Sequence, residues 1–501
     1  MAAPRIHTIV SHVSHGAFFI PLVTLLMMVS CGRTARRAPS APAIGGECTV
    51  AQVPAAIADT LRIALQHAVD ISQAPVPNHY SDRLLYRQLY ETLIRVDCTG
   101  RVTPSLAQAW RRKDGGRRWS FTLRSDARFW DGTPVTAALV VDSWRETGSA
   151  ELHGLNPDSL FVDGGRVLEV VFARPLQSVP SLFAATEMAV IRRTTGVAWP
   201  VGTGPYQISR YDAGRVVVEP AADRRGGKPT LEFQAVRGRD PRDVIDDRYD
   251  LVITSDARSL DYAAAKPDRD LVALPWDASY VFAAARAGGT REQTADVRLG
   301  LPVEMREELA RDAVRIDARA STPPSWWDQL ADCHIKPAEH QVASERPQQG
   351  SARIAFESAD AVARGLAERI VALAGAAGGR ELLQQLGVER ELAESVASGM
   401  TRLQAVALSK EDYGRELLSG NSMAYVLPLQ RLSMAPCRSA SDLVARASWM
   451  VPSGSTEGGA TVLQLGRVVV PLVDTRRHAV VYRGSMGLAV DWDAVPILLV
   501  P

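Results

Sequence analysis

Strand-like and helix-like segments alternate along most of this chain, and this alternation restricts the fold more than any other feature. Short apolar or alternating runs typical of strands occur at residues 60–69, 119–123 and 251–253. An amphipathic pattern at 360–374 places its apolar residues on one face of a helix. Elements in this order indicate an α/β protein with open mixed sheets.

Local patterns also predict individual elements. Apolar spacing indicates a helix over 84–94 and another over 381–400. Thr136, which follows a turn, is a suitable N-cap for the next helix. Near the end of the chain, 468–473 and 479–482 are predicted as two separate strands.

Composition limits the class of protein. The chain has 501 residues, 46% of them apolar, so it contains enough apolar material for a folded core. Its 57 basic and 56 acidic residues give a net charge of +1, which removes the electrostatic argument for a nucleic-acid partner. At roughly 150 residues per domain, the length suggests about three units.

The N-terminus has the pattern of a bacterial export signal. Residues 17–29 are an apolar run, too short to span a bilayer as a helix, and Ser30 and Cys31 follow it. Small or apolar residues before a cysteine resemble a lipobox, which predicts a signal peptide over 1–30 and lipidation of Cys31. The alternative is a buried hydrophobic helix with an incidental cysteine. Residues 31–47, poor in apolar side chains, are expected to form a flexible tether.

The remaining cysteines predict disulfides. An exported protein enters an oxidising compartment, and an even number of cysteines is left after Cys31. Of the three possible connectivities, we favour pairing within the N-terminal pair and within the later pair. These cysteines are Cys48 and Cys98, then Cys333 and Cys437.

A metal site is the alternative use of one cysteine. Cys333, His334 and His340 offer three possible metal ligands within eight residues. Their spacing does not match a known zinc motif, so disulfides are the preferred interpretation and no metal is expected.

Catalytic motifs are missing from the sequence. We find no Gly-x-Ser-x-Gly, His-Glu-x-x-His, Gly-x-x-x-x-Gly-Lys or Gly-x-Gly-x-x-Gly segment. Gly202-Thr203-Gly204 is followed by Pro-Tyr and a strand, not by the helix N-terminus of a phosphate-binding loop. Missing motifs do not disprove an enzyme, because a catalytic triad is assembled in space and not in sequence. With no motif to support a hydrolase, we expect neither an enzyme nor a cofactor.

Several blocks of sequence together resemble a known family. The most specific block is 89–144, with a Tyr-Glu helix, Pro-x-Leu-Ala before a Trp, and Phe-x-Asp-Gly-x-Pro before a helix. Gly-Thr-Gly-Pro-Tyr at 202–206, an acidic turn and strand at 246–253, and Val-Pro-Leu at 470–472 follow in order. This chain resembles the family 5 extracellular solute-binding proteins, the peptide-, nickel- and oligosaccharide-binding components of ABC importers.

The resemblance implies a two-lobe periplasmic-binding-protein fold, type II-like, with an inserted subdomain. The core of lobe I would comprise 48–95, 200–275 and 456–501, and the subdomain 96–199. Lobe II would be 276–455, with a hinge at the two crossovers that bound it.

The resemblance also implies a function. Such a protein captures a small solute, most often an oligopeptide, in the cleft between its lobes and delivers it to ABC permease subunits. We expect a monomer, anchored by its N-terminal lipid to the periplasmic or extracellular face of a bacterial membrane. The alternative is a degenerate relative: an envelope lipoprotein with a sensory or structural role and no transport ligand.

Two segments depart from the family pattern. Residues 296–302 match only the start of the expected Val-Arg-x-Ala helix. Residues 425–431 carry no acid where peptide-binding members have the residue that holds the peptide's amino group. An anionic or neutral ligand would suit Arg431 better.

Five residues are candidates for the ligand cleft. Tyr80 follows the first strand, and Trp276 and Tyr280 lie at the entry to lobe II. Tyr425 and Arg431 flank the late strand. Each aromatic could instead serve packing, and an arginine on a loop could be solvated.

Overall fold

The computed structural model describes only part of the chain. The described residues are 48–51, 58–152, 155–173, 175–212, 214–222, 228–285, 301–313, 318–320, 334–335, 351–431, 443, 447, 463–464 and 469–499. The predicted signal peptide and tether, with Cys31, lie outside them, as do Cys333, His340 and Cys437. In the part that is described, no helix is long and apolar enough to cross a membrane.

One mixed sheet of eleven strands organises the structure. Its strands run in the order β17 (Gln404–Leu408), β16 (Ser351–Glu357), β18 (Ser422–Gln430), β13 (Arg269–Ala284), β20 (Val469–Tyr482), β12 (Leu251–Thr254), β2 (Thr60–Leu65), β11 (Thr230–Ala235), β10 (Arg215–Pro220) and β9 (Tyr206–Asp212), with β14 (Ala318–Ala320) beside β20. Parallel pairs join β2 to β11 and β12, and β16 to β17 and β18, while the other pairs are antiparallel.

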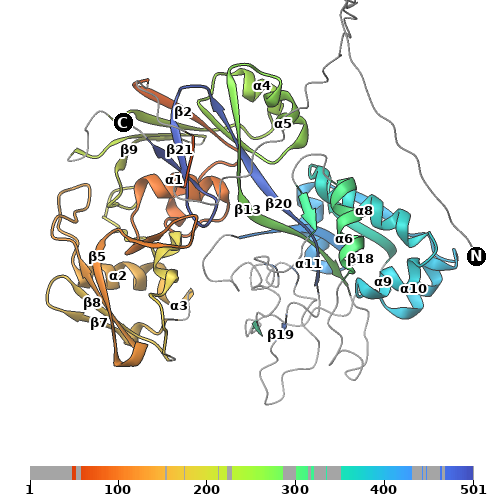
Figure 1. Cartoon of the computed structure of the whole chain (residues 1–501), viewed down its shortest axis with the longest axis horizontal. Helices are drawn as coiled ribbons and strands as arrows, with labels where there is room; N and C mark the ends of the chain where they lie inside the picture. Colours follow the sequence, from red (N-terminus) through yellow and green to blue (C-terminus); the bar gives the residue numbers. More distant parts are fainter. Residues whose placement is uncertain are drawn as a thin grey trace, which may run out of the picture. The chain divides into compact units, whose positions relative to one another are not determined.

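Two long antiparallel strands, β13 and β20, lie side by side through the middle of this sheet (Figure 1). Near one end of the pair, Ala479 and Val481 belong to a buried cluster with β2 and α1 (Tyr80–Leu89). Near the other end, Phe282 and Val470 belong to a second cluster with β16 and β18. The chain therefore passes between two hydrophobic cores along each of these strands.

The prediction of two strands at 468–473 and 479–482 was wrong, because β20 is continuous. The polar residues between them pair with β13, with Asp474 opposite Ser279 and Arg476 opposite Trp276, and the register shifts on both sides of Trp276. The hydroxyl of Ser279 donates a hydrogen bond to the buried carboxylate of Asp474. The backbone of this polar stretch remains paired with β13, so the strand is not interrupted.

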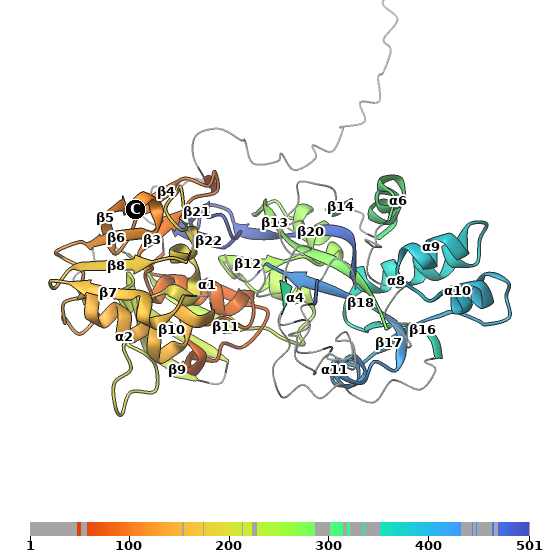
Figure 2. The same cartoon turned by 90° about the horizontal axis from the view of Figure 1, so that it is seen from below.

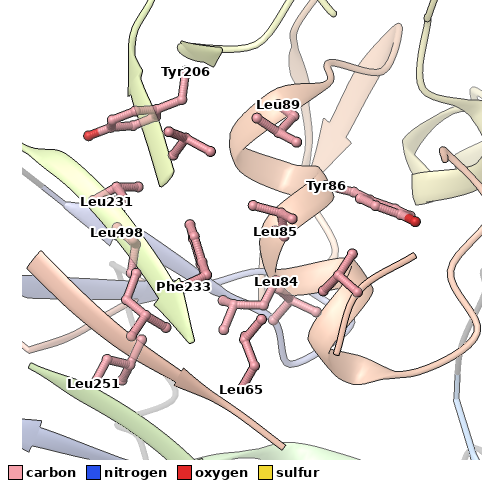
Figure 3. Close-up of a cluster of buried hydrophobic side chains, with 14 of the residues drawn as sticks. Leu65, Leu84, Leu85, Tyr86, Leu89, Tyr206, Leu231, Phe233, Leu251 and Leu498 are labelled. Carbon is pink, nitrogen blue, oxygen red and sulfur yellow. The ribbon is translucent and has the colours of Figure 1, made fainter. Parts of the chain in front are cut away.

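The first cluster packs the apolar face of α1 on the sheet. Figure 3 shows Leu84 and Leu85 of α1 on the side of Phe233 from β11. On the other face of the sheet, a smaller cluster includes Val244 of α4 (Pro241–Asp246) and Ala263 of α5 (Ala257–Ala264). The predicted helix over 84–94 therefore starts earlier and ends at Leu89, and Ile94 lies in a strand.

The end of α1 is fixed by a close approach of Gly204. The backbone N–H of Gly204 donates to the carbonyl of Leu89 at 2.9 Å. The indole N–H of Trp130 donates to the carbonyl of Gly204 at 3.1 Å. A Cβ atom on Gly204 would lie 2.4 Å from the carbonyl carbon of Leu89, closer than a real contact allows. The Gly-Thr-Gly segment is thus a packing element between α1 and Trp130.

We expect Gly204→Ala to lower the unfolding free energy by about 1–3 kcal/mol, because backbone atoms must move to admit a methyl group. Gly414→Ala is the matched control. Gly414 lies inside α11 (Lys410–Ser419) with nothing within 4 Å of an added Cβ, so alanine should stabilise by about 1 kcal/mol. Urea unfolding of both variants measures the difference. Equal effects would contradict the assigned role of Gly204.

A third cluster lies within residues 93–190. Its sheet has the order β5 (Ala107–Lys113), β6 (Arg118–Leu123), β8 (Val167–Val171) and β7 (Leu160–Asp163). It packs against α2 (Ala137–Thr147), where the hydroxyl of Thr136 accepts from the N–H of Leu139 as the sequence predicts. Short elements nearby are β3 (Ile94–Val96), β4 (Val102–Pro104) and α3 (Ser149–Leu152).

Helices cover the strands of the second cluster (Figure 2). The predicted helix over 360–374 is α8 (Ala361–Ala374), capped by Asp360. The single helix predicted over 381–400 is instead two, because Gly387 has a φ of 86° between them. The remaining helices here are α6 (Val303–Ala313), α9 (Gly379–Gln385) and α10 (Arg390–Ala397).

The described N-terminal residues are joined to the rest of the fold in two ways. A three-stranded sheet pairs β1 (Thr49–Ala51) with β21 (Gly487–Val490), which also pairs with β22 (Pro496–Leu499). Cys48, next to β1, forms a disulfide with Cys98. A further small pair is β15 (His334–Ile335) with β19 (Leu463–Gln464).

Candidate functional site

A cavity of about 240 Å³ lies beyond the carboxyl ends of the parallel strands β2 and β12. The end of β18 and the middle of β20 complete its wall. The lining residues are Ala64, Leu65, Gln66, His67, His79, Tyr80, Ser81, Leu84, Ile253, Thr254, Ser255, Asp256, Gln430 and Arg477.

The topology explains why polar groups meet here. The carboxyl ends of neighbouring parallel strands form a crevice in open α/β sheets, and ligands commonly bind there. Helices α1 and α5 both begin at this edge, so their free N–H groups and positive dipole ends face the same region. Asp256 caps α5 by accepting from the N–H of Ser259 at 2.7 Å.

Two stacked histidines form one wall of the cavity. The rings of His67 and His79 are 4.7 Å apart and nearly parallel. His79 Nδ1 lies 2.9 Å from a carboxylate oxygen of Asp82. Burial, together with the charge of His79, lowers the pKa of His67 to about 4. His67 is therefore neutral at physiological pH and presents a flat, weakly polar surface.

The low pKa of His67 predicts acid sensitivity. Between pH 6.5 and about 4 the unfolded chain binds a proton at His67 that the native state excludes, so native stability falls as pH falls through this window. We expect His67→Gln to reduce the slope of unfolding free energy against pH in this range. Urea titrations at several pH values measure it, and an unchanged slope would contradict the assignment.

Arg477 is the charged residue of β20 that lines the cavity. Its guanidinium forms an ion pair with the buried carboxylate of Asp277 on β13. It also stacks over the ring of Tyr80, 4.4 Å from the centroid. The Tyr80 hydroxyl donates to the carbonyl of Ala494 at 2.7 Å, and burial raises the pKa of Tyr80 above its usual range. Arg477 is thus held in place from two sides.

A buried ionic cluster lies next to this site. The Asp493 carboxylate accepts from the guanidinium groups of Arg83 and Arg87, and Asp491 accepts from Arg87 and Arg95. Arg83 also donates to the backbone carbonyl of Arg431 at 2.7 Å. These contacts tie α1 to the C-terminal segment and to the end of β18.

The five predicted cleft residues are found in different environments. Tyr80 lines the cavity, and Arg431 follows Gln430 at its edge, stacked over Trp492. Tyr280 donates to the carboxylate of Asp360. Tyr425 is fully buried, and its hydroxyl donates a hydrogen bond to the backbone carbonyl of Glu416. The guanidinium of Arg476 stacks over the ring of Trp276. The last three do not line the cavity.

Sequence reasoning missed several residues of the cavity, above all His67, His79, Gln430 and Arg477. His67 and His79 are 12 positions apart, Gln430 and Arg477 come much later, and no motif spacing relates the four. The strand expected over 60–69 ends at Leu65, so Gln66 and His67 follow it and were wrongly placed inside it. The available signal was positional for Ser255, which comes soon after the strand expected at 251–253 and directly after β12.

A second cavity of about 300 Å³ lies at the carboxyl end of α1, near β3 and β22. Its polar lining includes Arg87, Arg95 and Asp491 of the ionic cluster.

Among the described residues, no group of three or more histidine, cysteine, aspartate or glutamate side chains is arranged to hold a metal ion.

One segment of the chain matches a family model. Residues 101–236 match the model described as bacterial extracellular solute-binding proteins, family 5 middle. This segment includes most of the third cluster, together with β9, β10 and β11. It overlaps the blocks on which the sequence resemblance rests.

Curated relatives match over short segments. The nickel-binding periplasmic protein of Escherichia coli (strain K12) is 26% identical over 163 residues, 27% of this chain and 30% of that protein. The periplasmic murein peptide-binding protein MppA of the same strain is 36% identical over 88 residues, 16% of each chain. Its periplasmic oligopeptide-binding protein OppA is 37% identical over 81 residues, 16% of this chain and 14% of that one. The matches thus span less than a third of these relatives.

Solved structures match over most of the chain. A dipeptide binding protein from Pseudoalteromonas sp. SM9913, in complex with Met-Leu, has a TM-score of 0.59 at 13% identity and covers 87% of this chain and 98% of that one. The Escherichia coli murein tripeptide binding protein MppA has a TM-score of 0.54 at 14% identity and covers 89% and 100%. At these identities the likeness concerns the fold, and it confirms the predicted α/β, two-lobe periplasmic-binding-protein fold. These relatives and structures are all named as binding proteins, in agreement with the expectation of a non-enzyme.

Proposed function

We propose that this chain, which has the fold and the middle segment of the family 5 extracellular solute-binding proteins, binds a small solute and delivers it to the permease of an ABC importer. The observation that carries the proposal is the cavity beyond the carboxyl ends of β2 and β12. It is lined from β2, α1 and β12 on one side and from β18 and β20 on the other.

The position of this cavity supports ligand capture. Its walls belong to elements of both large hydrophobic clusters, which are joined through β13 and β20. A solute between such walls stabilises the arrangement in which they are close, and this is how a binding protein couples ligand to closure. We propose the hinge at these two strands. The lobe and subdomain boundaries are proposed as the sequence predicts them, except that the crossover expected near 455 moves into β20, because Val470 packs in the second cluster and Ala479 in the first.

We also propose a class of ligand and a location for this protein. Relatives are named for nickel, murein peptide and oligopeptide binding, so a peptide or a similar small solute is the first class to test here. We propose a monomer outside the cytoplasm, held at a membrane by lipid on Cys31. Intact-mass measurement of the membrane-extracted protein tests the lipid, since an unmodified N-terminus would exclude it.

Ligand-induced stabilisation tests the proposed function. A solute present at 100 times its Kd should raise the unfolding free energy by about 2.7 kcal/mol, because it binds only the native state. The screen uses dipeptides, longer peptides, sugars and metal chelates, read by thermal unfolding and then by calorimetry. The absence of any shift, together with no small molecule in mass spectra of the purified protein, would contradict it.

A cavity-filling variant locates the site. Ser255 lines the cavity on its exposed side, so Ser255→Trp should weaken binding without unfolding the protein. Ser398→Trp, at an exposed position after α10, is the matched control and should bind as the wild type does. Equal binding by both variants would place the solute elsewhere.

One observation favours a second candidate function. The cavity of about 240 Å³ is smaller than the roughly 300–1,000 Å³ typical of ligand pockets. A degenerate envelope lipoprotein with a sensory or structural role would have such a reduced cleft. In that case Ser255→Trp would leave its cellular role intact, whereas an importer subunit would lose uptake.

A further inference from the structure

Several guanidinium groups lie close to the cavity, most of them buried, and they outnumber the carboxylates that contact them. The arginines are Arg83, Arg87, Arg431 and Arg477, and the aspartates are Asp277, Asp491 and Asp493. Arg95, whose side chain is 44% exposed, also forms an ion pair with Asp491. Buried charges are normally paired, and Arg431 is the arginine of this set whose guanidinium is contacted by no carboxylate of the described residues.

Two of these arginines have unused hydrogen-bonding capacity. Arg431 stacks over Trp492 at 4.9 Å, and no carboxylate contacts its guanidinium within the described part of the chain. Arg477 bonds Asp277 through one nitrogen, and its guanidinium has no other hydrogen bond to any described residue. A guanidinium has five N–H donors in a planar fork, so Arg477 retains donors for an acceptor in the cavity.

Arg477 is also pre-organised for a ligand. Its side chain is 14% exposed and is fixed between the carboxylate of Asp277 and the ring of Tyr80. Side chains held in one geometry lose little entropy when a ligand binds. Arg477 also lines the cavity, so we expect its free donors to be within reach of a solute there.

One carboxylate among the described residues, that of Asp256, lines the cavity and opposes an anion. Its charge is partly offset because it accepts from the N–H and hydroxyl of Ser259. The low pKa of His67 keeps that ring neutral, and the carboxylate of Asp82 contacts His79. The N-termini of α1 and α5 add positive potential at the same edge.

We propose that the solute carries a carboxylate, and that Arg477 binds this carboxylate in the cavity beyond β2 and β12. The inference rests on the proposed function and names the chemical class of its ligand. The carboxylate could belong to the C-terminus of a short peptide or to a small organic acid, and the two sources share the same recognition chemistry.

Matched pairs of compounds test the class. We would measure binding of Ala-Ala, N-acetyl-Ala-Ala, Ala-Ala-amide, succinate and succinamide by calorimetry on the full chain. The inference expects each acid to bind at least about 30-fold more tightly than its amide, the loss typical when a buried charge loses its partner. Binding of both peptide acids identifies a C-terminus, and binding of succinate alone identifies a small organic acid.

Variants locate the interaction. Arg477→Gln should weaken acid binding at least about 30-fold, and Arg477→Lys by less. Because Arg477→Gln leaves Asp277 unpaired in the interior, the double variant Arg477→Gln/Asp277→Asn removes both charges and guards against misfolding. Arg483→Gln is the control: this arginine follows β20, is 60% exposed and pairs with Asp270 outside the cavity.

The outcomes distinguish failure of the carboxylate inference from failure of the proposed solute binding. If amides bind as tightly as acids, or if the folded double variant binds acids like the wild type, the inference is overturned while the proposed function stands. If peptides, acids, sugars and chelates all fail to bind, the inference and the proposed function fail together.

Discussion

Asp493→Ala is expected to lower the unfolding free energy by about 3–5 kcal/mol, a large share of the stability of a typical domain. The carboxylate of Asp493 is fully buried and accepts from both Arg83 and Arg87. Its removal leaves Arg83, which is 1% exposed, with an uncompensated charge in the interior. Breaking a buried pair in this way costs more than the pair itself contributes, because the desolvation of the remaining ion is not repaid.

The pH dependence of this cluster has a definite sign. Burial opposes the ionisation of Asp493, but the guanidinium groups of Arg87 and Arg83 outweigh it and hold the pKa of Asp493 below its usual value. The stabilisation is therefore present at neutral pH and is lost as pH falls through that lowered pKa. Asp493→Asn should remove this acid-side loss while keeping the shape of the side chain.

Urea unfolding at neutral pH measures the effect of Asp493→Ala. The matched control is Asp412→Ala, whose side chain is 51% exposed and pairs with Arg415 on the surface. Exposed pairs of this kind contribute about 0–1 kcal/mol, so the control should remain near wild type. If the two variants lost similar amounts, the cluster around Asp493 would not be the rigid connection between α1 and the C-terminal segment that its contacts indicate.

The parts of this fold that could be predicted from sequence are those determined by neighbouring residues. Thr136 and Asp360 cap helices through hydrogen bonds to N–H groups three residues away, so their role is visible in the local pattern. Alternation over 119–123 likewise predicted β6, which the structure places at Arg118–Leu123. Short-range signals of this kind were sufficient to indicate an α/β chain.

The errors arise where distant residues decide the structure. The helix expected over 84–94 ends at Leu89 because Gly204, more than a hundred residues later, bonds its carbonyl. Strand β20 is continuous because its central polar residues pair with β13. Neither partner can be identified from the pattern around the segment itself.

The candidate site was predicted least well, for the same reason. Tyr80 was identified from its place after the first strand, and it does line the cavity. Tyr425 was chosen from its place near a late strand, but β18 is covered on the side to which this ring points, and the ring is fully buried. Arg477 lies in the middle of a strand between polar neighbours, where nothing in the sequence distinguishes it from the solvated arginines of the surface.

Removal of the Cys48–Cys98 disulfide is the second change with a large expected effect. The bridge joins residues separated by 50 positions. In the chain-entropy description, opening a loop of this length restores unfolded-state freedom that corresponds to about 4 kcal/mol, and measured losses are typically about 2–4 kcal/mol. The described N-terminal strand β1 has only three residues and pairs with β21, so few other contacts compensate for the loss.

The double variant Cys48→Ser/Cys98→Ser tests this prediction in urea without reductant, which leaves the other cysteines in their existing state. Cys98→Ser alone opens the same loop and should lose a similar free energy, so agreement between the two variants separates loop entropy from the chemistry of a free thiol. Because the constraint acts mainly on the unfolded chain, solute binding by the folded protein should be unchanged. A loss below about 1 kcal/mol would mean that the unfolded chain is already compact near Cys48, so that the bridge restricts little.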